Sequence, residues 1–110
     1  MRASLGLLLV VTACGISVDR ESFPEQRAEA WCAFEKACYT AEFYYDHTNV
    51  QDCIDDEARI WSDVESEYEE CNFSEDKAAE CLEWFNRSCK VTGKELDQLT
   101  NDCEAIWRCG

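Results

Sequence analysis

Apolar side chains recur every three or four residues in four segments of the chain, which is the spacing of one face of an α-helix. The segments cover residues 22–38, 48–71, 74–89 and 92–107. Their apolar members are, in chain order, Phe23, Ala30, Trp31, Phe34, Ala37 and Cys38; Val50, Cys53, Ile54, Trp61, Val64, Tyr68 and Cys71; Ala78, Cys81, Leu82, Phe85 and Cys89; and Leu96, Leu99, Cys103, Ile106 and Trp107. No segment sustains the alternation of a strand beyond residues 43–45. We therefore expect an all-α bundle of three clear helices and a fourth short one.

Capping residues indicate where the first two helices begin. Ser22 is followed three positions later by Glu25, which predicts a capping box, and Pro24 is tolerated in the first turn. Thr48 and Gln51 repeat the same spacing. The sequence therefore predicts one helix that begins at Ser22 and a second that begins near Thr48, with a loop between them.

The starts of the later helices are marked less evenly. Ser74 precedes two acidic residues, which favour the positive end of a helix, and this predicts the start of the third helix. Gly93 offers that helix a stop. The fourth helix has two possible starts, Thr92 with Glu95 or only Thr100.

At the amino terminus Arg2 precedes an apolar run over residues 5–11, and small residues lead to Cys14 and Gly15. This pattern resembles a bacterial lipoprotein signal peptide. The run is too short to span a bilayer as a helix, which needs about 20 apolar residues. The resemblance implies that Cys14 becomes the first mature residue and carries lipid. An ordinary signal peptide cut after Gly15 remains the alternative, and it would give a freely secreted protein.

Three parts of the chain follow from this interpretation. Residues 1–13 form the signal peptide, residues 14–21 a lipidated tether, and residues 22–110 a disulfide-rich helical domain. Glycine rather than aspartate after the lipidated cysteine implies, by analogy with enteric bacteria, transport to the outer membrane. We expect an outer-membrane lipoprotein of the cell envelope, attached to the membrane through its lipid.

Nine cysteines are present, and eight remain when Cys14 is lipidated or removed. An even number at this density in a short exported chain predicts four disulfides rather than a metal or redox centre. The eight are Cys32, Cys38, Cys53, Cys71, Cys81, Cys89, Cys103 and Cys109. Eight cysteines permit 105 pairings, so spacing alone does not choose among them. If antiparallel neighbours are stapled at their joints, the pairs are Cys38–Cys53, Cys71–Cys81, Cys89–Cys103 and Cys32–Cys109.

The chain is strongly acidic, with 24 Asp and Glu against 10 Lys and Arg and a formal net charge of −14. Such a charge repels phosphate backbones and anionic lipid surfaces, so we expect no nucleic-acid partner. A protein partner with a cationic surface is compatible with it, and so is plain solubility. We expect a monomer.

Each predicted helix carries one tryptophan: Trp31, Trp61, Trp84 and Trp107. A small domain needs the large apolar areas of indole rings in its core, so packing of these rings on disulfides is the simpler interpretation. An exposed aromatic contact surface is the alternative, and Trp84 is its best candidate. Leu82 and Phe85 already supply the adjoining apolar stripe.

The predicted loop before the second helix is rich in aromatic residues. We expect its surface to be the interaction site, since tyrosine rings give contact area at a low cost in entropy. The rings folding onto the core is the alternative. The candidate residues are Tyr39, Phe43, Tyr44, Tyr45 and His47.

No feature of the sequence predicts catalysis or a bound cofactor. His47 is the only histidine and has no second imidazole to help it hold zinc, so we expect no metal site. No serine lies in a glycine-rich nucleophile turn. The second helix is densely acidic, which is typical of a solvated face. A small hydrolase that uses paired carboxylates is the weakest alternative, because it needs a cleft that holds them at set distances.

Several segments share a pattern of cysteine spacing: the lipobox Val11-Thr12-Ala13-Cys14, Trp31-Cys32 to Lys36-Ala37-Cys38, Cys71-Asn72-Phe73-Ser74, Ala78-Ala79-Glu80-Cys81-Leu82, Cys89, and Cys103 to Cys109. Together they resemble the small cysteine-rich predicted lipoproteins that are abundant in myxobacteria and their relatives. The resemblance implies an anchored helical domain outside the cytosol and carries no activity. We therefore expect a non-enzymatic binding or interaction module of the cell envelope.

Overall fold

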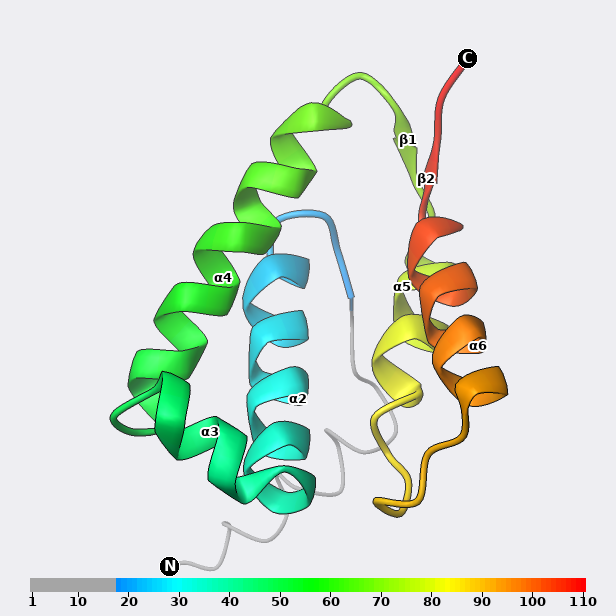
Figure 1. Cartoon of the computed structure of the whole chain (residues 1–110). Coiled ribbons are helices and arrows are strands. Elements are labelled where there is room, and N and C mark those ends of the chain that lie inside the picture. The colour runs from blue at the N-terminus through cyan, green and yellow to red at the C-terminus, as the bar shows by residue number, and fades with distance from the viewer. Residues whose placement is uncertain (1–17) are drawn as a thin grey trace, which may run out of the picture.

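The computed structural model describes residues 18–110, so the predicted signal peptide and Cys14 lie outside the described residues. Within the described part the chain is mostly helical, and four disulfides staple it (Figure 1). Its elements are α2 (Phe23–Cys38), α3 (Thr40–Asp46), α4 (Val50–Glu67), β1 (Asn72–Phe73), α5 (Glu75–Glu83), α6 (Gly93–Glu104) and β2 (Trp107–Arg108). The predicted all-α, disulfide-stapled fold class is confirmed. None of the helices in residues 18–110 is long and apolar enough to cross a membrane.

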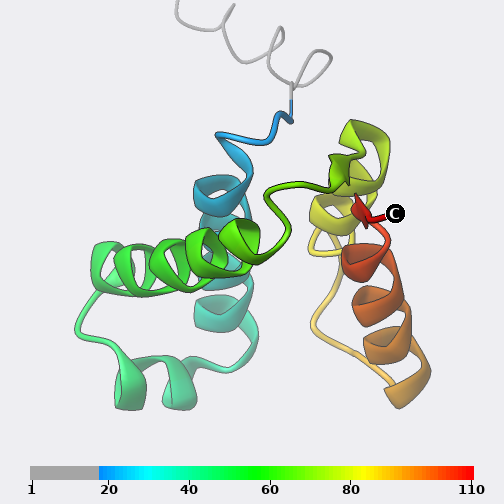
Figure 2. The same cartoon turned by 90° about the horizontal axis from the view of Figure 1, so that it is seen from above.

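The helices form two groups that lie beside each other. α2 packs against α4 and α3, while α5 and α6 pair with each other, and α2 also contacts α5. Figure 2 shows α5 and α6 set apart from α2, α3 and α4. The short strands β1 and β2 pair antiparallel, with Asn72 opposite Arg108 and Phe73 opposite Trp107. This ladder ties the carboxyl terminus back to the segment that follows α4.

Two apolar clusters stabilise the fold. The first joins the two groups of helices, and its buried members are Val18, Phe23, Ala78, Cys81, Cys103 and Ile106. Phe23 is fully buried at its centre and meets the rings of Trp61, Phe73 and Trp107 edge to face. The second cluster lies within the first group of helices, where the buried residues Cys32, Phe43 and Cys53 pack together.

The disulfides are Cys32–Cys53, Cys38–Cys89, Cys71–Cys109 and Cys81–Cys103. All eight predicted cysteines take part, but the four predicted pairs are wrong. The prediction assumed that each joint between consecutive helices is closed by the nearest cysteines. Instead Cys32 and Cys53 meet inside the second cluster, and Cys38 reaches across to Cys89 of the other group. The β1–β2 ladder brings Cys109 to Cys71, and Cys81–Cys103 joins α5 to α6.

The residues before α2 belong to the folded domain, although the sequence placed them in a tether. Val18 is buried in the first cluster. Arg20 forms an ion pair with Glu65 of α4 and donates a hydrogen bond to the carbonyl oxygen of Tyr68. The folded part therefore includes residues 18–21, and an anchor on Cys14 would be followed by only residues 15–17 before the buried Val18.

The predicted caps of α2 and α4 are both displaced. The side chain of Ser22 makes no capping bond; instead the Asp19 carboxylate accepts the backbone N–H of Ser22 at 2.8 Å. At α4 the cap is Asn49, whose side chain accepts the N–H of Asp52 at 2.8 Å. Gln51 contacts Asp55 one turn later instead of capping. At α4 the strong capping residue Asn49 takes the role that we assigned to Thr48, whereas at α2 no side chain caps the first turn.

α5 begins after Ser74 as predicted, with the N–H of Lys77 donating to the Ser74 hydroxyl at 3.2 Å. It ends at Glu83 rather than near Cys89, because the chain turns away so that Cys89 can reach Cys38. Gly93 does not stop α5; it opens α6.

The start of α6 at Thr92 is confirmed, and the alternative start at Thr100 is wrong. A complete capping box forms, in which the N–H of Glu95 donates to the Thr92 hydroxyl at 3.2 Å and the N–H of Thr92 donates to the Glu95 carboxylate at 2.9 Å. The Thr92 hydrogen bond lowers the pKa of Glu95. The local signal determined this start because both partners of the box lie within one turn.

Candidate functional site

The predicted interaction loop is a helix, and it divides the five candidate residues. Phe43 is fully buried in the second cluster and is therefore not a surface residue, contrary to the prediction. His47 lies one turn later on the same inward face, with its ring 5.5 Å from that of Phe43. Tyr39, Tyr44 and Tyr45 are exposed, and Tyr45 is 90 % exposed. Helical spacing thus turns two of the five side chains inward.

Trp84 does not form the exposed aromatic surface that we considered. It is 6 % exposed, and its indole N–H donates to the carbonyl oxygen of Glu95 at 2.9 Å. The Phe34 ring lies against it at 5.6 Å, and the Arg87 guanidinium lies 4.5 Å from its ring centroid. Trp84 therefore joins α2 to the start of α6.

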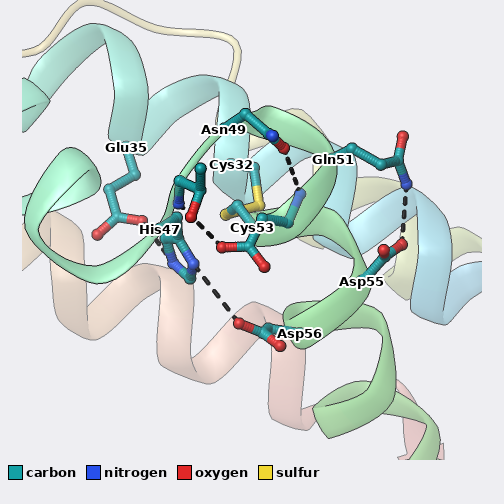
Figure 3. Close-up of a disulfide and its surroundings, with 10 residues drawn as sticks. Cys32, Glu35, His47, Asn49, Gln51, Cys53, Asp55 and Asp56 are labelled. Carbon is teal, nitrogen blue, oxygen red and sulfur yellow. Dashed lines mark hydrogen bonds and ion pairs between the residues drawn. A yellow bond between two sulfur atoms is a disulfide. The ribbon is translucent and has the colours of Figure 1, made fainter.

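His47 lies between carboxylates that come from two helices (Figure 3). Its Nε2 is 3.9 Å from Oε1 of Glu35 on α2, and its Nδ1 is 3.6 Å from Oδ2 of Asp56 on α4. Burial raises the pKa of Glu35, and His47 opposes that rise. Asp52 lies on the same side of α4 and accepts the N–H of Thr48 at 2.9 Å. We call Glu35, His47, Asp52 and Asp56 the His47 cluster.

A cleft of about 360 Å³ opens between α4 and α6. It is lined by Arg27, Trp61, Val64, Tyr68, Leu99, Thr100, Cys103, Glu104 and Trp107, and we call it the Arg27 cleft. Its volume falls within the range of small-molecule sites, about 300–1,000 Å³. Three aromatic rings form its α4 side and one end: Trp107 stacks on Tyr68 at 4.9 Å and lies nearly parallel to Trp61 at 6.4 Å.

Arg27 is 9 % exposed and stands among rings rather than carboxylates. Its guanidinium carbon lies 4.6 Å from the ring centroid of Trp61 and 4.7 Å from that of Phe85. Desolvation lowers the pKa of Arg27 to about 10, and the negative charge of Glu57 opposes that shift. The group therefore stays protonated at neutral pH, as a cation stabilised by aromatic faces.

Three N–H donors of the cleft have no acceptor among residues 18–110. They are Nε and Nη1 of Arg27 and Nε1 of Trp107, and all three atoms are buried. A buried donor without a partner costs about 1–3 kcal/mol, more for a charged group. The wall of the cleft thus contains a cation and an indole N–H whose donors are covered by neighbouring protein atoms, so an acceptor would reach them only if side chains of the wall shift.

Sequence reasoning missed Arg27, although a signal was present. Arg27 follows Phe23 by four residues and precedes Trp31 by four, so it occupies a position on the apolar stripe of α2. A positively charged side chain on the apolar face of a helix is expected to be buried together with that face. What the sequence does not contain is the identity of the rings around it, because Trp61 and Phe85 lie far along the chain.

Most of the acidic side chains of α4 behave as a partly solvated face. Glu57 is the exception with a shifted pKa, which is raised by burial and lowered in turn by Arg27. Glu65 is engaged by Arg20. Asp56 has a second neighbour, with its Oδ1 3.4 Å from an exposed guanidinium nitrogen of Arg59.

No family model, no curated protein and no solved structure matches this chain. The class of protein is therefore defined by the fold itself: a small all-α domain stapled by four disulfides. Disulfides at this density indicate an oxidising compartment outside the cytosol.

Proposed function

We propose that this protein is a lipid-anchored, non-enzymatic binding protein of the bacterial cell envelope, and that the Arg27 cleft holds its ligand. The observation that carries the proposal is the buried Arg27, whose Nε and Nη1 lack acceptors at the wall of an aromatic cleft. The ligand class that fits is a small organic anion, with a carboxylate for Arg27 and a flat apolar group for the rings.

The carboxylate part of this ligand follows from the charges of the cleft. Arg27 supplies a positive charge at the wall, and its two buried N–H groups and that of Trp107 would gain an acceptor if the wall shifts around a bound anion. Hydrogen bonds to charged groups contribute about 1.5–3 kcal/mol each. Of the described residues that line the cleft, Glu104 is the one carboxylate, and it is exposed on α6. An anion therefore enters beside a single negative side chain.

The flat apolar part follows from the rings. The Trp107 ring lies nearly parallel to the rings of Trp61 and Tyr68. The three rings together form an apolar wall of the cleft. A planar group that packs against such a wall gains both buried apolar area and ring–ring contact. Aliphatic chains would gain the first contribution without the second.

A matched pair of probes tests the ligand class. We expect 2-naphthoate to quench tryptophan fluorescence saturably and to raise the midpoint of thermal unfolding. The neutral 2-naphthamide should bind at least about tenfold more weakly, since it loses the charge-assisted bond to Arg27. Arg27→Met should remove the preference for the anion, while Arg59→Met, which changes an exposed arginine of α4, should leave it intact.

Equal binding of the two probes, or unchanged 2-naphthoate binding in Arg27→Met, would contradict the proposal. Circular dichroism and thermal unfolding of both variants show whether the fold is preserved. Saturable binding of 2-naphthamide alone would assign the cleft to neutral aromatic ligands instead.

The anchor is tested on the native protein. Intact mass and detergent partitioning distinguish Cys14 bearing acyl chains from a chain that begins after Gly15. Because Val18 is buried, a lipidated Cys14 lies within about 14 Å of it, from the maximum reach of four extended residues. The domain would therefore sit directly at the outer membrane surface. Cys14→Ser should release the protein from the membrane fraction; recovery of an unacylated, fully soluble native chain would favour a secreted effector or inhibitor.

A protein-binding surface on α3 is a second candidate. Tyr45 is 90 % and Tyr44 52 % exposed, so both rings are open to a partner. A partner with a cationic surface would meet these rings beside the acidic residues of α4. Alanine at both tyrosines should abolish capture of such a partner from envelope extracts without unfolding the domain; unchanged capture would remove this surface from consideration.

A further inference from the structure

We propose that the His47 cluster is a zinc site, with Nδ1 of His47 and one carboxylate oxygen each from Asp52 and Asp56 as ligands and Glu35 as the residue that orients the imidazole. The site is separate from the Arg27 cleft and does not depend on what that cleft binds. The residues come from α2, from the turn after α3 and from the first turns of α4 (Figure 3).

The distances suit a small divalent cation. One ligand atom each from His47, Asp52 and Asp56 lies within 4.8 Å of the other two. His47 Nδ1 and Asp56 Oδ2 are 3.6 Å apart. Two ligands of a tetrahedral zinc ion with bonds of about 2.1 Å lie about 3.4 Å apart. The pair is thus within a few tenths of an ångström of the coordinating separation before any adjustment.

The local fold explains why these three side chains converge. Asp52 and Asp56 are four residues apart, so they lie on the same face of α4. Asn49 caps α4 and turns the chain so that His47 lies over that face. The Cys32–Cys53 disulfide holds α2 against the same turn of α4. Cys53 itself is not a ligand, because its sulfur is in the disulfide and a metal requires the thiolate.

The imidazole supplies an independent observation that points to a ligand. Its side chain is 10 % exposed, and the buried Nδ1 has no hydrogen-bond partner among residues 18–110. A buried ring nitrogen without a partner is unfavourable. Asp56 lies in front of it but is too distant for a hydrogen bond, and a cation between the two atoms would satisfy both.

Glu35 completes the arrangement on the opposite side of the ring. Its Oε1 is 3.9 Å from Nε2 of His47, and that oxygen also lacks a hydrogen-bond partner among the described residues. Metal-bound histidines usually donate their other ring N–H to a carboxylate or carbonyl oxygen, which fixes the tautomer and the ring orientation. Glu35 therefore acts as a positioning residue that leaves the lone pair of Nδ1 for the metal.

The surrounding charges favour a divalent cation. Besides burial, the negative charges of Asp46, Glu57 and Glu42 raise the pKa of Glu35, and the charge of His47 lowers it. Arg59 is a competing cation near Oδ1 of Asp56; its side chain is 68 % exposed, and Oδ2 of Asp56 remains directed toward His47. One histidine nitrogen with two carboxylate oxygens is a ligand set that zinc accepts, and it leaves the fourth position to water.

The experiment uses the oxidised mature protein, freed of metal with EDTA, and titrates it with zinc chloride. We expect one zinc ion per chain by calorimetry and elemental analysis. Because the chain has one histidine, ¹⁵N-imidazole NMR reports on that residue alone, and the Nδ1 resonance should move to a metal-bound position. His47→Gln should abolish saturable binding, and Glu35→Gln should weaken it about 10- to 100-fold.

Asp55→Asn is the matched control for Asp56→Asn. Both lie on α4, one residue apart, but Asp55 contacts Gln51 and not His47. We expect Asp56→Asn to weaken zinc binding at least tenfold and Asp55→Asn to change it less than about twofold. Equal effects of the two variants would show diffuse attraction to the acidic face, and would overturn the proposal.

The main alternative is an imidazolium held between Glu35 and Asp56 without any metal. In that case zinc leaves the ¹⁵N resonances of His47 unchanged, and the proposal fails even if zinc binds elsewhere. The NMR measurement is made on the unaltered protein, so it decides the matter even if His47→Gln does not fold. Arg27→Met should bind zinc normally, which separates failure of this site from failure of the cleft.

Discussion

His47 and Arg27 are both polar residues buried beside an apolar cluster, yet their surroundings differ. His47 comes from the turn between α3 and α4, lies beside the second cluster, and faces the carboxylates of Glu35 on α2 and Asp56 on α4. Arg27 lies beside the first cluster and faces the rings of Trp61 and Phe85, which come from distant parts of the chain, with no carboxylate within ion-pair distance among residues 18–110. One site is built locally and is rich in charge; the other is assembled from distant segments and is rich in unused donors.

This difference implies that each site is held by a different disulfide. Cys32–Cys53 closes the local site over 21 residues, and Cys71–Cys109 closes the cleft by bringing the segment with Trp107 back to α4 over 38 residues. Removing Cys32–Cys53 should therefore weaken binding at the His47 cluster, and removing Cys71–Cys109 should weaken binding in the Arg27 cleft.

Replacing Cys32 and Cys53 by alanine should have the largest effect. Both cysteines are fully buried, so the variant loses the crosslink and leaves a gap in the second cluster. We expect the free energy of unfolding, measured by urea denaturation, to fall by about 2–5 kcal/mol. Zinc binding should be lost or strongly weakened. Intact zinc affinity in this variant would show that the His47 cluster does not need the disulfide.

Replacing Cys71 and Cys109 by serine should cost less, about 2 kcal/mol, because this bond lies at a more exposed edge and leaves no core gap. The β1–β2 ladder should loosen and Trp107 should move from the cleft. 2-Naphthoate binding should therefore weaken while zinc binding stays normal. The opposite pattern would break the comparison between the two sites.

Arg27→Met tests whether the buried cation serves binding or stability. Methionine fills a similar volume and keeps contact with Trp61 and Phe85. It removes the guanidinium group, whose pKa is lowered to about 10 by burial. We expect the free energy of unfolding at pH 7 to rise by about 1 kcal/mol, since the desolvation cost disappears and the cation–π attraction offsets only part of it. A fall of similar size would identify Arg27 as a structural bridge between the two groups of helices.

Thr92→Ala removes the cap of the helix that forms one wall of the cleft. The Thr92 side chain accepts the N–H of Glu95, so its loss should cost about 1 kcal/mol in thermal or urea unfolding. Ser22→Ala is the matched control, because the Ser22 side chain makes no capping bond. Its effect should stay within about 0.5 kcal/mol. Equal losses in the two variants would mean that Ser22 caps α2 in solution.

The pH dependence of stability should separate Glu35 from the other carboxylates. Burial raises the pKa of Glu35, so the folded state binds this proton more readily than the unfolded state, and the ionised carboxylate opposes folding at neutral pH. In metal-free protein we expect Glu35→Gln to be more stable than the parent at pH 7. The difference should shrink as the pH falls through the raised pKa and vanish below the ordinary glutamate value of about 4.3. A less stable variant at pH 7 would show that the pairing with His47 outweighs burial.

The sequence by itself determined the features that depend on neighbours within a few residues. Helical spacing marked the apolar stripes, and Thr92 with Glu95 marked the start of α6, because both signals act within one turn. The even count of the eight cysteines after Cys14 indicated four disulfides. Short-range signals also misled, as at Ser22, whose side chain makes no capping bond while its N–H donates to the Asp19 carboxylate.

Only the tertiary structure decided which cysteines pair and which polar residues become buried. Cys38 meets Cys89 across 51 residues, and Arg27 meets Trp61 and Phe85 from other helices. His47, three residues before α4, meets Glu35 and Asp56 only because α2 and α4 pack with α3 folded back beside them. Such contacts depend on how the helix faces pack together, and that packing is a property of the whole chain rather than of any segment within it.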